Sequence, residues 1–254
     1  MRFASLGSGS EGNALVVQHG STVVMMDCGF GLADTETRLA RLGLKPSDVS
    51  ALVVTHEHSD HIGGVARFAR KHKVKVWLTH GTARHVAPES LLSELYGFID
   101  PHAVFAVGDL EVRPYLVPHD ASEPVQFVFS DGNTTLGVLT DTGCSTAHIE
   151  EMLSGVDALV LECNHDLDML MSGPYPAGLK RRVSGKFGHL DNRTAAALLA
   201  QLDCSRLKHI IAAHLSQQNN RPELAAQALS AVLSCEPAWI GIAGQATGFG
   251  WRDL

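Results

Sequence analysis

The 254-residue chain has few cysteines, and they do not form a recognisable pattern. The five lie singly along the chain, no CxxC pair occurs and their number is odd: Cys28, Cys144, Cys163, Cys204 and Cys235. A disulfide framework needs paired cysteines, and a cysteine-type zinc site needs closely spaced ones. The sequence therefore predicts free, mostly buried thiols.

Long apolar runs and an excess of positive charge are also missing. No apolar stretch is long enough to cross a bilayer, and the N-terminus lacks the apolar core of a signal peptide. We therefore expect a cytoplasmic protein that does not bind membranes. The net charge of -7 argues against a uniformly basic nucleic-acid-binding surface, although carboxylates that bind metal would contribute to that charge.

No low-complexity linker or short-period repeat divides the chain, so we expect a single domain over residues 1–254. Short segments rich in β-branched residues, bounded by Gly, Ser or Asn, predict strands at Arg2–Leu6, Ala14–Gln18, Thr22–Met26, Leu52–Val54, Val74–Leu78, Val104–Val107, Glu111–Val117, Val125–Phe129, Thr135–Leu139, Ala158–Leu161, His209–Ala213 and Trp239–Ile242. Helical spacing predicts helices after Gly64 and at Asp34–Leu42, Ser145–Leu153, Arg193–Leu202 and Pro222–Leu233.

Because strands and covering helices mix in both halves, the pattern predicts an α/β sandwich with helices outside two sheets. The composition of Leu167–Lys186, rich in Met, Gly, Pro and basic residues, predicts a long loop there. Gly7-x-Gly9-x-x-Gly12 matches a dinucleotide-binding fingerprint, but that fingerprint must open a helix. The segment that follows it here reads as a strand, so we interpret the glycines as a turn.

One dense cluster carries the chemistry: Thr55-His56-Glu57-His58-Ser59-Asp60-His61, directly after a predicted buried strand and before Gly63-Gly64. If the chain leaves the strand extended, His56 and His58 point the same way and can hold one metal ion. Asp60 and His61 follow where the chain turns, and they can reach a second ion nearby. The alternative is a chance cluster of polar loop residues.

This cluster resembles the complete HxHxDH motif of the metallo-β-lactamase superfamily, as His56-x-His58-x-Asp60-His61. The resemblance requires four further residues in order, each after a predicted strand, and the chain supplies Asp27, His119, Asp141 and His214. A lone residue of this kind is more often structural, whereas the ordered set is specific and covers nearly the whole chain. The fold it implies is an αββα sandwich of two mixed β-sheets flanked by helices.

The resemblance also implies the roles of these residues. One metal ion would be held by His56, His58 and His119, and a second by Asp60, His61 and His214. Asp141 would bridge both ions, and Asp27 would orient the cluster by hydrogen bonding. His and carboxylate ligands suit zinc, manganese or iron. Because antibiotic-cleaving members carry Cys at the bridging position, β-lactam hydrolysis is not expected.

Other segments indicate which branch of the superfamily the chain resembles. Gly188-His189 resembles the Gly-His loop of phosphodiesterase members such as tRNase Z, in which the His assists at the scissile phosphate. Ser5–Asn13, Glu162–Asp166 and the stretch Tyr175-Pro176…Leu179-Lys180-Arg181-Arg182 resemble the YycJ-like (WalJ-like) branch, whose members are described as DNA exonucleases. His165 and His189 are therefore candidate catalytic residues, with loop packing or helix capping as the alternative.

A basic run precedes His189: Lys180, Arg181, Arg182 and Lys186. Such runs are usually solvated, but beside a metal site they can hold the phosphates of a nucleic acid. His189 also stands just before a predicted helix start, whose free N–H groups favour an anion.

These observations predict a binuclear metal-dependent phosphodiesterase, a nuclease acting on DNA through a metal-bound hydroxide, with His189 as proton donor to the leaving oxygen. The alternatives are a small-molecule hydrolase, either a cyclic-phosphate phosphodiesterase or a glyoxalase II-like thioesterase, and a non-catalytic binding protein. The sequence leaves open the identity of the metals, DNA against RNA, strand polarity and oligomeric state.

Overall fold

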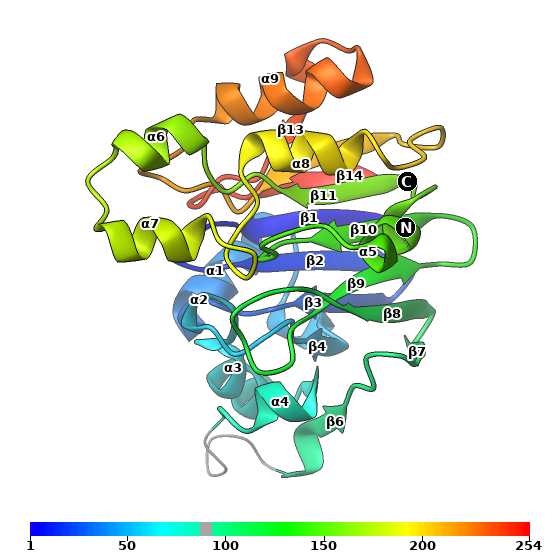
Figure 1. The fold of residues 1–254 in the computed structure, drawn as a ribbon. Coiled ribbons are helices and arrows are strands. Elements are labelled where there is room, and N and C mark those ends of the chain that lie inside the picture. The colour runs from blue at the N-terminus through cyan, green and yellow to red at the C-terminus, as the bar shows by residue number, and fades with distance from the viewer. Residues whose placement is uncertain (87–92) are drawn as a thin grey trace.

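The computed structural model describes residues 1–86 and 93–254, and it contains two seven-stranded sheets packed face to face (Figure 1). The strands of the first sheet are β1 (Arg2–Gly7), β2 (Ala14–His19), β3 (Thr22–Met26), β4 (Ala51–Val53), β5 (Lys75–Leu78), β6 (Tyr96–Phe98) and β14 (Phe249–Asp253). Those of the second are β7 (Phe105–Val107), β8 (Leu110–Leu116), β9 (Val125–Ser130), β10 (Thr135–Leu139), β11 (Ala158–Glu162), β12 (His209–Ala213) and β13 (Gly241–Ile242).

Helices cover the outer face of each sheet. The helices of the described part of the chain are α1 (Leu32–Arg41), α2 (Ser59–Ile62), α3 (Val65–His72), α4 (His80–Ala83), α5 (Ala147–Leu153), α6 (Leu167–Ser172), α7 (Ala177–Val183), α8 (Asn192–Leu199) and α9 (Pro222–Leu233), with 3-10 turns at Pro46–Asp48, Ser93–Leu95 and Pro237–Trp239. None of the helices in the described part of the chain combines the length and the apolar character that a bilayer crossing requires.

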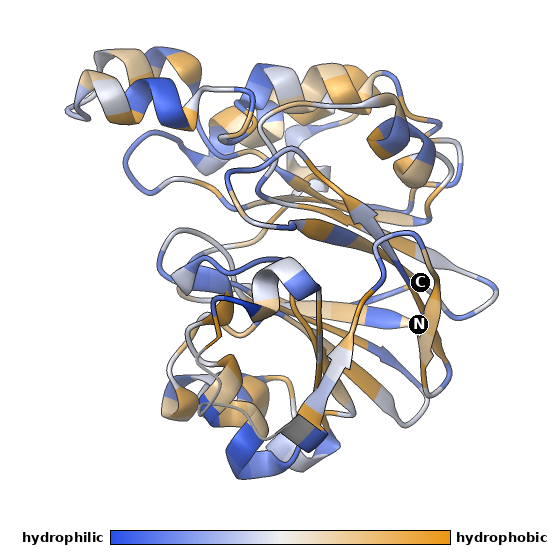
Figure 2. Cartoon of the chain, turned by 60° about the horizontal axis from the view of Figure 1, so that its bottom comes forward, coloured by the Kyte–Doolittle hydropathy of each residue, from blue (hydrophilic) through white to orange (hydrophobic). Residues whose placement is uncertain are grey.

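Three apolar clusters account for the layers. The central one joins residues of both sheets, such as Phe3 and Phe127, and fills the space between them. The second packs α5, α8 and α9 on the second sheet, and the third packs α1 and α3 on the first. Figure 2 shows the resulting order of helices, sheet, sheet and helices, with apolar strands in the middle. The predicted αββα sandwich is confirmed.

Strand direction explains where functional residues gather. The two sheets repeat one topology: an antiparallel meander, β1–β3 or β7–β10, continues into parallel strands, β3–β6 or β10–β13. Consequently β1, β3 and β4 in one sheet and β8, β10, β11 and β12 in the other all end at the same edge. Loops at the carboxyl ends of such strands are where α/β proteins place their sites.

The predicted loop Leu167–Lys186 is wrong, because most of it forms α6 and α7. Each helix is too short to show an apolar period, and Gly173-Pro174 separates them, so sequence periodicity could not detect either. Asp166 caps α6 by accepting the Met169 N–H, and Leu170 is fully buried beneath it. Figure 1 shows the two helices beyond the strand ends rather than on a sheet face.

Sequence reasoning also overlooked the short strand β6 and the short helices α2 and α4. It extended the last predicted strand too far: Trp239 belongs to a 3-10 turn, and β13 contains only Gly241–Ile242.

Candidate metal centre

The structure brings seven of the predicted residues together at the shared edge of the two sheets. Side-chain atoms that could hold an ion lie within 4.8 Å of one another in several groups, including His56, His58 and His119, and separately Asp60, His61 and His214. These are the two trios that the resemblance implies. The seven residues lie after β4, β8, β10 and β12, with Asp60 and His61 on α2, so the grouping depends on both sheets.

The first trio is held by backbone and hydroxyl groups. His119 Nδ1 donates to the Gly188 carbonyl at 3.1 Å, which turns His119 Nε2 toward His58 Nδ1, 3.2 Å away. His56 Nδ1 lies 3.0 Å from the Thr55 hydroxyl, whereas its Nε2 is buried without a hydrogen-bond partner. Burial, with the nearby His61, lowers the pKa of His56 well below its usual value, so its ring is neutral and keeps a lone pair.

The second trio is tied to carboxylates. Asp60 Oδ2 lies 3.3 Å from His61 Nε2 and 3.5 Å from His214 Nε2, and it accepts the Asn13 amide at 3.1 Å. Asp60 and His61 belong to α2, which begins at Ser59, earlier than the helix expected after Gly63-Gly64. Burial alone would lower the pKa of His214, but Asp141, Asp60 and Glu162 outweigh burial and raise that pKa to about 10.

Asp141 stands between the two trios. Its Oδ2 is 3.1 Å from His61 Nε2, and its Oδ1 is 3.5 Å from His214 Nε2 and 4.0 Å from His119 Nε2. Burial alone would raise the pKa of this carboxyl, but His214 and His61 hold the pKa well below its usual range, so the group is ionised. Asp141 Oδ2 is buried and accepts no hydrogen bond.

These unpartnered atoms test whether divalent ions suit the site. A buried imidazole nitrogen and a buried carboxylate oxygen without partners are costly, and few native groups remain so. His56 Nε2 and Asp141 Oδ2 belong to one group of possible ligands, together with His61. A cation among them would satisfy both atoms, so the donor set fits divalent metal ions.

Backbone strain marks the same edge. Asp27, Asp141 and His214 have φ values of 60°, 52° and 54°, in the left-handed region, and each directly follows a strand or stands one residue beyond it. A non-glycine residue there costs on the order of 1 kcal/mol, and such strain clusters at functional sites because surrounding contacts hold it. It turns these side chains out of the strand direction and toward the centre.

Asp27 supports the first sheet's side. Its Oδ2 accepts a hydrogen bond from His61 Nδ1 at 2.8 Å and another from the Thr55 hydroxyl at 2.8 Å, while its Oδ1 accepts the Thr55 N–H. His61 Nε2 is thereby aimed at the centre. Asp27 itself is fully buried beneath His61, as expected for a residue that orients a ligand.

Glu162 plays the corresponding part on the second side, and sequence reasoning assigned it no role. Its Oε1 accepts from His189 Nδ1 at 2.8 Å and lies 3.3 Å from His214 Nδ1, while its Oε2 accepts the N–H groups of Thr142 and Leu190. Burial would raise its pKa, but His189 and His214 lower it to about 2. An acidic residue that ends a buried strand was the available signal.

His189 lies within the centre, 3.5 Å from Asp141 Oδ1. Burial alone would lower its pKa, but the Glu162 and Asp141 carboxylates raise it. The expected helix N-terminus is not available to an anion, however. Asp191 caps α8 by accepting the N–H groups of Arg193 and Thr194, and Glu162 already accepts that of Leu190.

A cavity of about 320 Å³ opens over these groups. It is lined by Ser10, His58, Ser59, Asp60, Asp120, Asp141, Leu179, Arg182, Val183, Gly188, His189 and His214. Of the four predicted phosphate-binding residues, only Arg182 lines it, and Arg182 Nε donates to Asp120 Oδ2 at 2.6 Å. Lys180 Nζ instead donates to the Met171 carbonyl, and Arg181 and Lys186 lie outside the lining.

Two buried features lie off this cavity. His165 is 1% exposed, its Nδ1 lies 3.2 Å from Asn164 Oδ1, and it is not among the lining residues.

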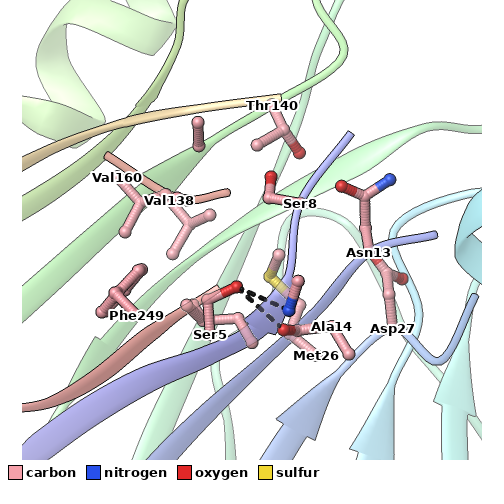
Figure 3. A pocket seen from close by; sticks show the side chains of 14 residues that line it. Ser5, Ser8, Asn13, Ala14, Met26, Asp27, Val138, Thr140, Val160 and Phe249 are labelled. Atoms are coloured by element: carbon pink, nitrogen blue, oxygen red, sulfur yellow. Dashed lines mark hydrogen bonds between the residues drawn. The ribbon is translucent and has the colours of Figure 1, made fainter. Parts of the chain in front are cut away.

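A second pocket, between the sheets behind Asn13 and Asp27, is mostly apolar and has room for about one water molecule (Figure 3). This second pocket is therefore too small for an organic ligand.

Comparison with known proteins gives a consistent result. The model of the metallo-β-lactamase superfamily matches residues 7–177. The chain is 38% identical to exodeoxyribonuclease YycJ of Bacillus anthracis, over 92% of this chain and 89% of that protein. It is 31% identical to exodeoxyribonuclease WalJ of Streptococcus pneumoniae, over 88% and 85%. Zinc-bound PqqB from Methylobacterium extorquens superposes over both whole chains with a TM-score of 0.76 at 16% identity, which shows a shared fold.

Proposed function

The chain belongs to the metallo-β-lactamase superfamily, and on that premise we propose that it is a metal-dependent exonuclease that hydrolyses the phosphodiester bonds of DNA. The observation that carries the proposal is the convergence of two ligand trios about Asp141, in a chain whose relatives over most of its length are named exodeoxyribonucleases. One domain over residues 1–254 is part of the proposal, because both sheets supply ligands to one centre.

The family implies divalent metal ions, and we propose two. His56, His58 and His119 would hold one, Asp60, His61 and His214 the other, and Asp141 would lie between them. When bound, such ions lower the pKa of water that they coordinate and neutralise charge on a phosphate. Zinc, manganese and iron all suit these ligands.

The charge of this site favours an anionic substrate. Two divalent ions would bring four positive charges, against which Asp60 and Asp141 bring two negative ones. The ions and these two carboxylates together would therefore carry residual positive charge, and this would favour the growing negative charge of phosphoryl displacement. A cytoplasmic location and a nucleic acid partner agree with this proposal.

We propose that His189 donates a proton to the leaving oxygen. Because Glu162 accepts from His189 Nδ1, the other ring nitrogen is the one available to the substrate, and His189 lines the cavity. The neighbouring carboxylates favour its protonated form. A positioned proton donor typically contributes about 10²–10⁴-fold to a rate.

Arg182 is the basic residue best placed to bind a phosphate oxygen, since it lines the cavity. Its ion pair with Asp120 holds the guanidinium at the rim, where a phosphate would have to share it. Lys180, Arg181 and Lys186 would contact more distant phosphates of the strand. His165 would act from behind the centre, by packing and orientation rather than by contact with substrate.

The thioesterase alternative is not favoured. The relatives that match most of this chain are named exodeoxyribonucleases, and hydroxyacylglutathione hydrolase of Rhodopseudomonas palustris matches only 42% of it.

An activity screen of metal-loaded protein tests the proposal. Labelled duplex DNA, single-stranded DNA, RNA, a cyclic phosphate ester, a thioester and a β-lactam would be compared, with and without chelator. We expect progressive, chelator-sensitive shortening of DNA from one end and no β-lactam hydrolysis. Efficient thioester cleavage without phosphodiester cleavage would overturn the assignment.

A further inference from the structure

An exposed aromatic side chain stands two residues before His189. Phe187 is 63% exposed, the highest value among the exposed large apolar side chains of residues 1–86 and 93–254. Single exposed apolar residues are ordinary. Phe187, however, is not alone in this part of the chain: Met171 on α6 and Leu179 on α7 are 49% and 37% exposed. Three of seven such residues therefore lie within 167–188.

The backbone that carries Phe187 is held firmly against the candidate metal centre. The Phe187 carbonyl accepts the Asp120 N–H at 3.0 Å, and the next carbonyl, of Gly188, accepts from His119 Nδ1. On the other side the chain packs on Gly143, where a Cβ would lie 2.3 Å from the carbonyl carbon of Lys186. The loop thus touches the segments that contribute His119 and Asp141.

Further contacts lock the loop to α7. The Gly188 N–H donates to the Gly185 carbonyl, and the His189 N–H donates to that of Val183, both at 2.8 Å. A Cβ at Gly188 would lie 2.2 Å from the Val183 oxygen, so only glycine permits this approach. Phe187 is therefore a largely solvated ring on a fixed backbone. A ring fixed in this way loses little conformational freedom when it binds a ligand.

We propose that Phe187 is a stacking platform for an unpaired nucleobase next to the phosphodiester bond in the cavity. The inference rests on the proposed function, which supplies a DNA strand at this place. Every base offers a flat π-face, so stacking suits an enzyme that must accept any sequence. Half-buried Lys180 and exposed Arg181, on the adjoining helix, provide the positive charge that accompanies stacking residues in proteins that bind single strands.

The test combines variants of Phe187 with DNA that lacks single bases. Oligonucleotides would carry one abasic residue at each of the first four positions from either end, and KM and kcat would be measured for the metal-loaded enzyme. For Phe187→Ala on intact DNA we expect KM to rise about 5- to 150-fold, the range that one stacked base contributes, with kcat little changed. At one abasic position the wild type should show the same rise.

The decisive result is the combination of both changes. If the ring stacks on that base, Phe187→Ala should lose nothing further on the matching abasic DNA, because the interaction is already absent. Phe187→Leu, which keeps an apolar side chain without an aromatic face, should behave like Phe187→Ala, and Phe187→Trp should bind at least as tightly as the wild type.

Trp239→Ala is the matched control. Trp239 is also exposed, but it precedes β13 and so lies at the opposite edge of the second sheet. Its KM should stay at the wild-type value. Melting temperature and bound metal should be unchanged in every variant.

Two results would overturn the inference while leaving the proposed function standing. Both presuppose a wild-type enzyme that degrades DNA. In the first, the KM increase caused by Phe187→Ala and the increase caused by an abasic residue would multiply at every position tested. In the second, Phe187→Leu would retain the wild-type KM. A wild-type enzyme that does not degrade DNA under any metal would instead remove the proposed function, and this inference with it.

Discussion

The two sheets contribute to the candidate metal centre in different ways. The first sheet's side is local: His56, His58, Asp60 and His61 lie within one short segment, and Asp27 holds His61 from the neighbouring strand end. The second sheet's side is assembled from separate loops, and one buried carboxylate, Glu162, contacts two histidines and two backbone N–H groups.

This difference separates metal binding from the rest of the chemistry. Asp27 touches a predicted metal ligand but not the predicted proton donor, whereas Glu162 touches both His214 and His189. Substitutions on the first sheet's side should therefore lower activity by weakening metal binding, and excess metal should restore the activity. Substitutions on the second sheet's side should lower activity even in excess metal.

The largest effect is expected where the two sides meet. Asp141→Ala removes the carboxylate that lies between both trios, so nearly all hydrolysis should be lost while the fold is kept. Turnover in metal-replete buffer, bound metal and melting temperature would be measured together. Activity within a few-fold of wild type would show that Asp141 is not the bridging group.

His189→Ala should come next, and only on poor leaving groups. Loss of a proton donor should lower turnover of an ordinary phosphodiester about 10²–10⁴-fold and that of a p-nitrophenyl ester much less. Leu190 and Asp191 should keep the loop in place through their bonds to Glu162 and α8. An equal loss of turnover on the two substrates would show that His189 is not the proton donor.

Glu162→Gln should lower activity about 10–100-fold and change its pH dependence. The Glu162 carboxylate raises the pKa of His189, and a protonated donor works below its pKa and is lost as pH rises through it. Without the carboxylate that pKa falls, so the alkaline limb of the rate profile should move to lower pH. An unmoved limb would separate Glu162 from proton donation.

Asp27→Asn provides the matched change on the first side. It should weaken metal binding about 10–100-fold, because His61 loses its charged partner, and the rate should recover in excess metal. The alkaline limb should stay where it is in the wild type. A pH shift like that of Glu162→Gln, or no recovery, would contradict the proposed division between the two sides.

The smallest effect concerns the basic helix. Arg182→Gln should weaken DNA binding and reduce the salt slope by about one, since Arg182 lines the cavity, whereas Arg181→Gln should change both less. Binding would be measured between low and physiological salt. An unchanged salt dependence of DNA binding in both variants, and in the double variant, would show that the basic run is only a solvated surface.

Sequence reasoning found most of the centre because each ligand follows a strand that a short apolar pattern reveals. The strands before Asp27, Asp141 and His214 were expected within a residue of where they lie. The features that sequence reasoning predicted wrongly depend on structure that no pattern along the chain reveals. α6 and α7 are too short to show a period, and the N–H groups expected to face a phosphate are accepted by Asp191 and Glu162.

The sequence by itself determined the fold class and the chemical types at the centre, because strand patterns and the order of ligand-type residues are local properties of the chain. Tertiary structure alone decided that Glu162 supports two histidines, that only Arg182 of the four basic residues reaches the cavity, and that Phe187 stays in solvent beside it. Contacts between loops of different strands depend on how two sheets pack, and no periodicity within one segment records that packing.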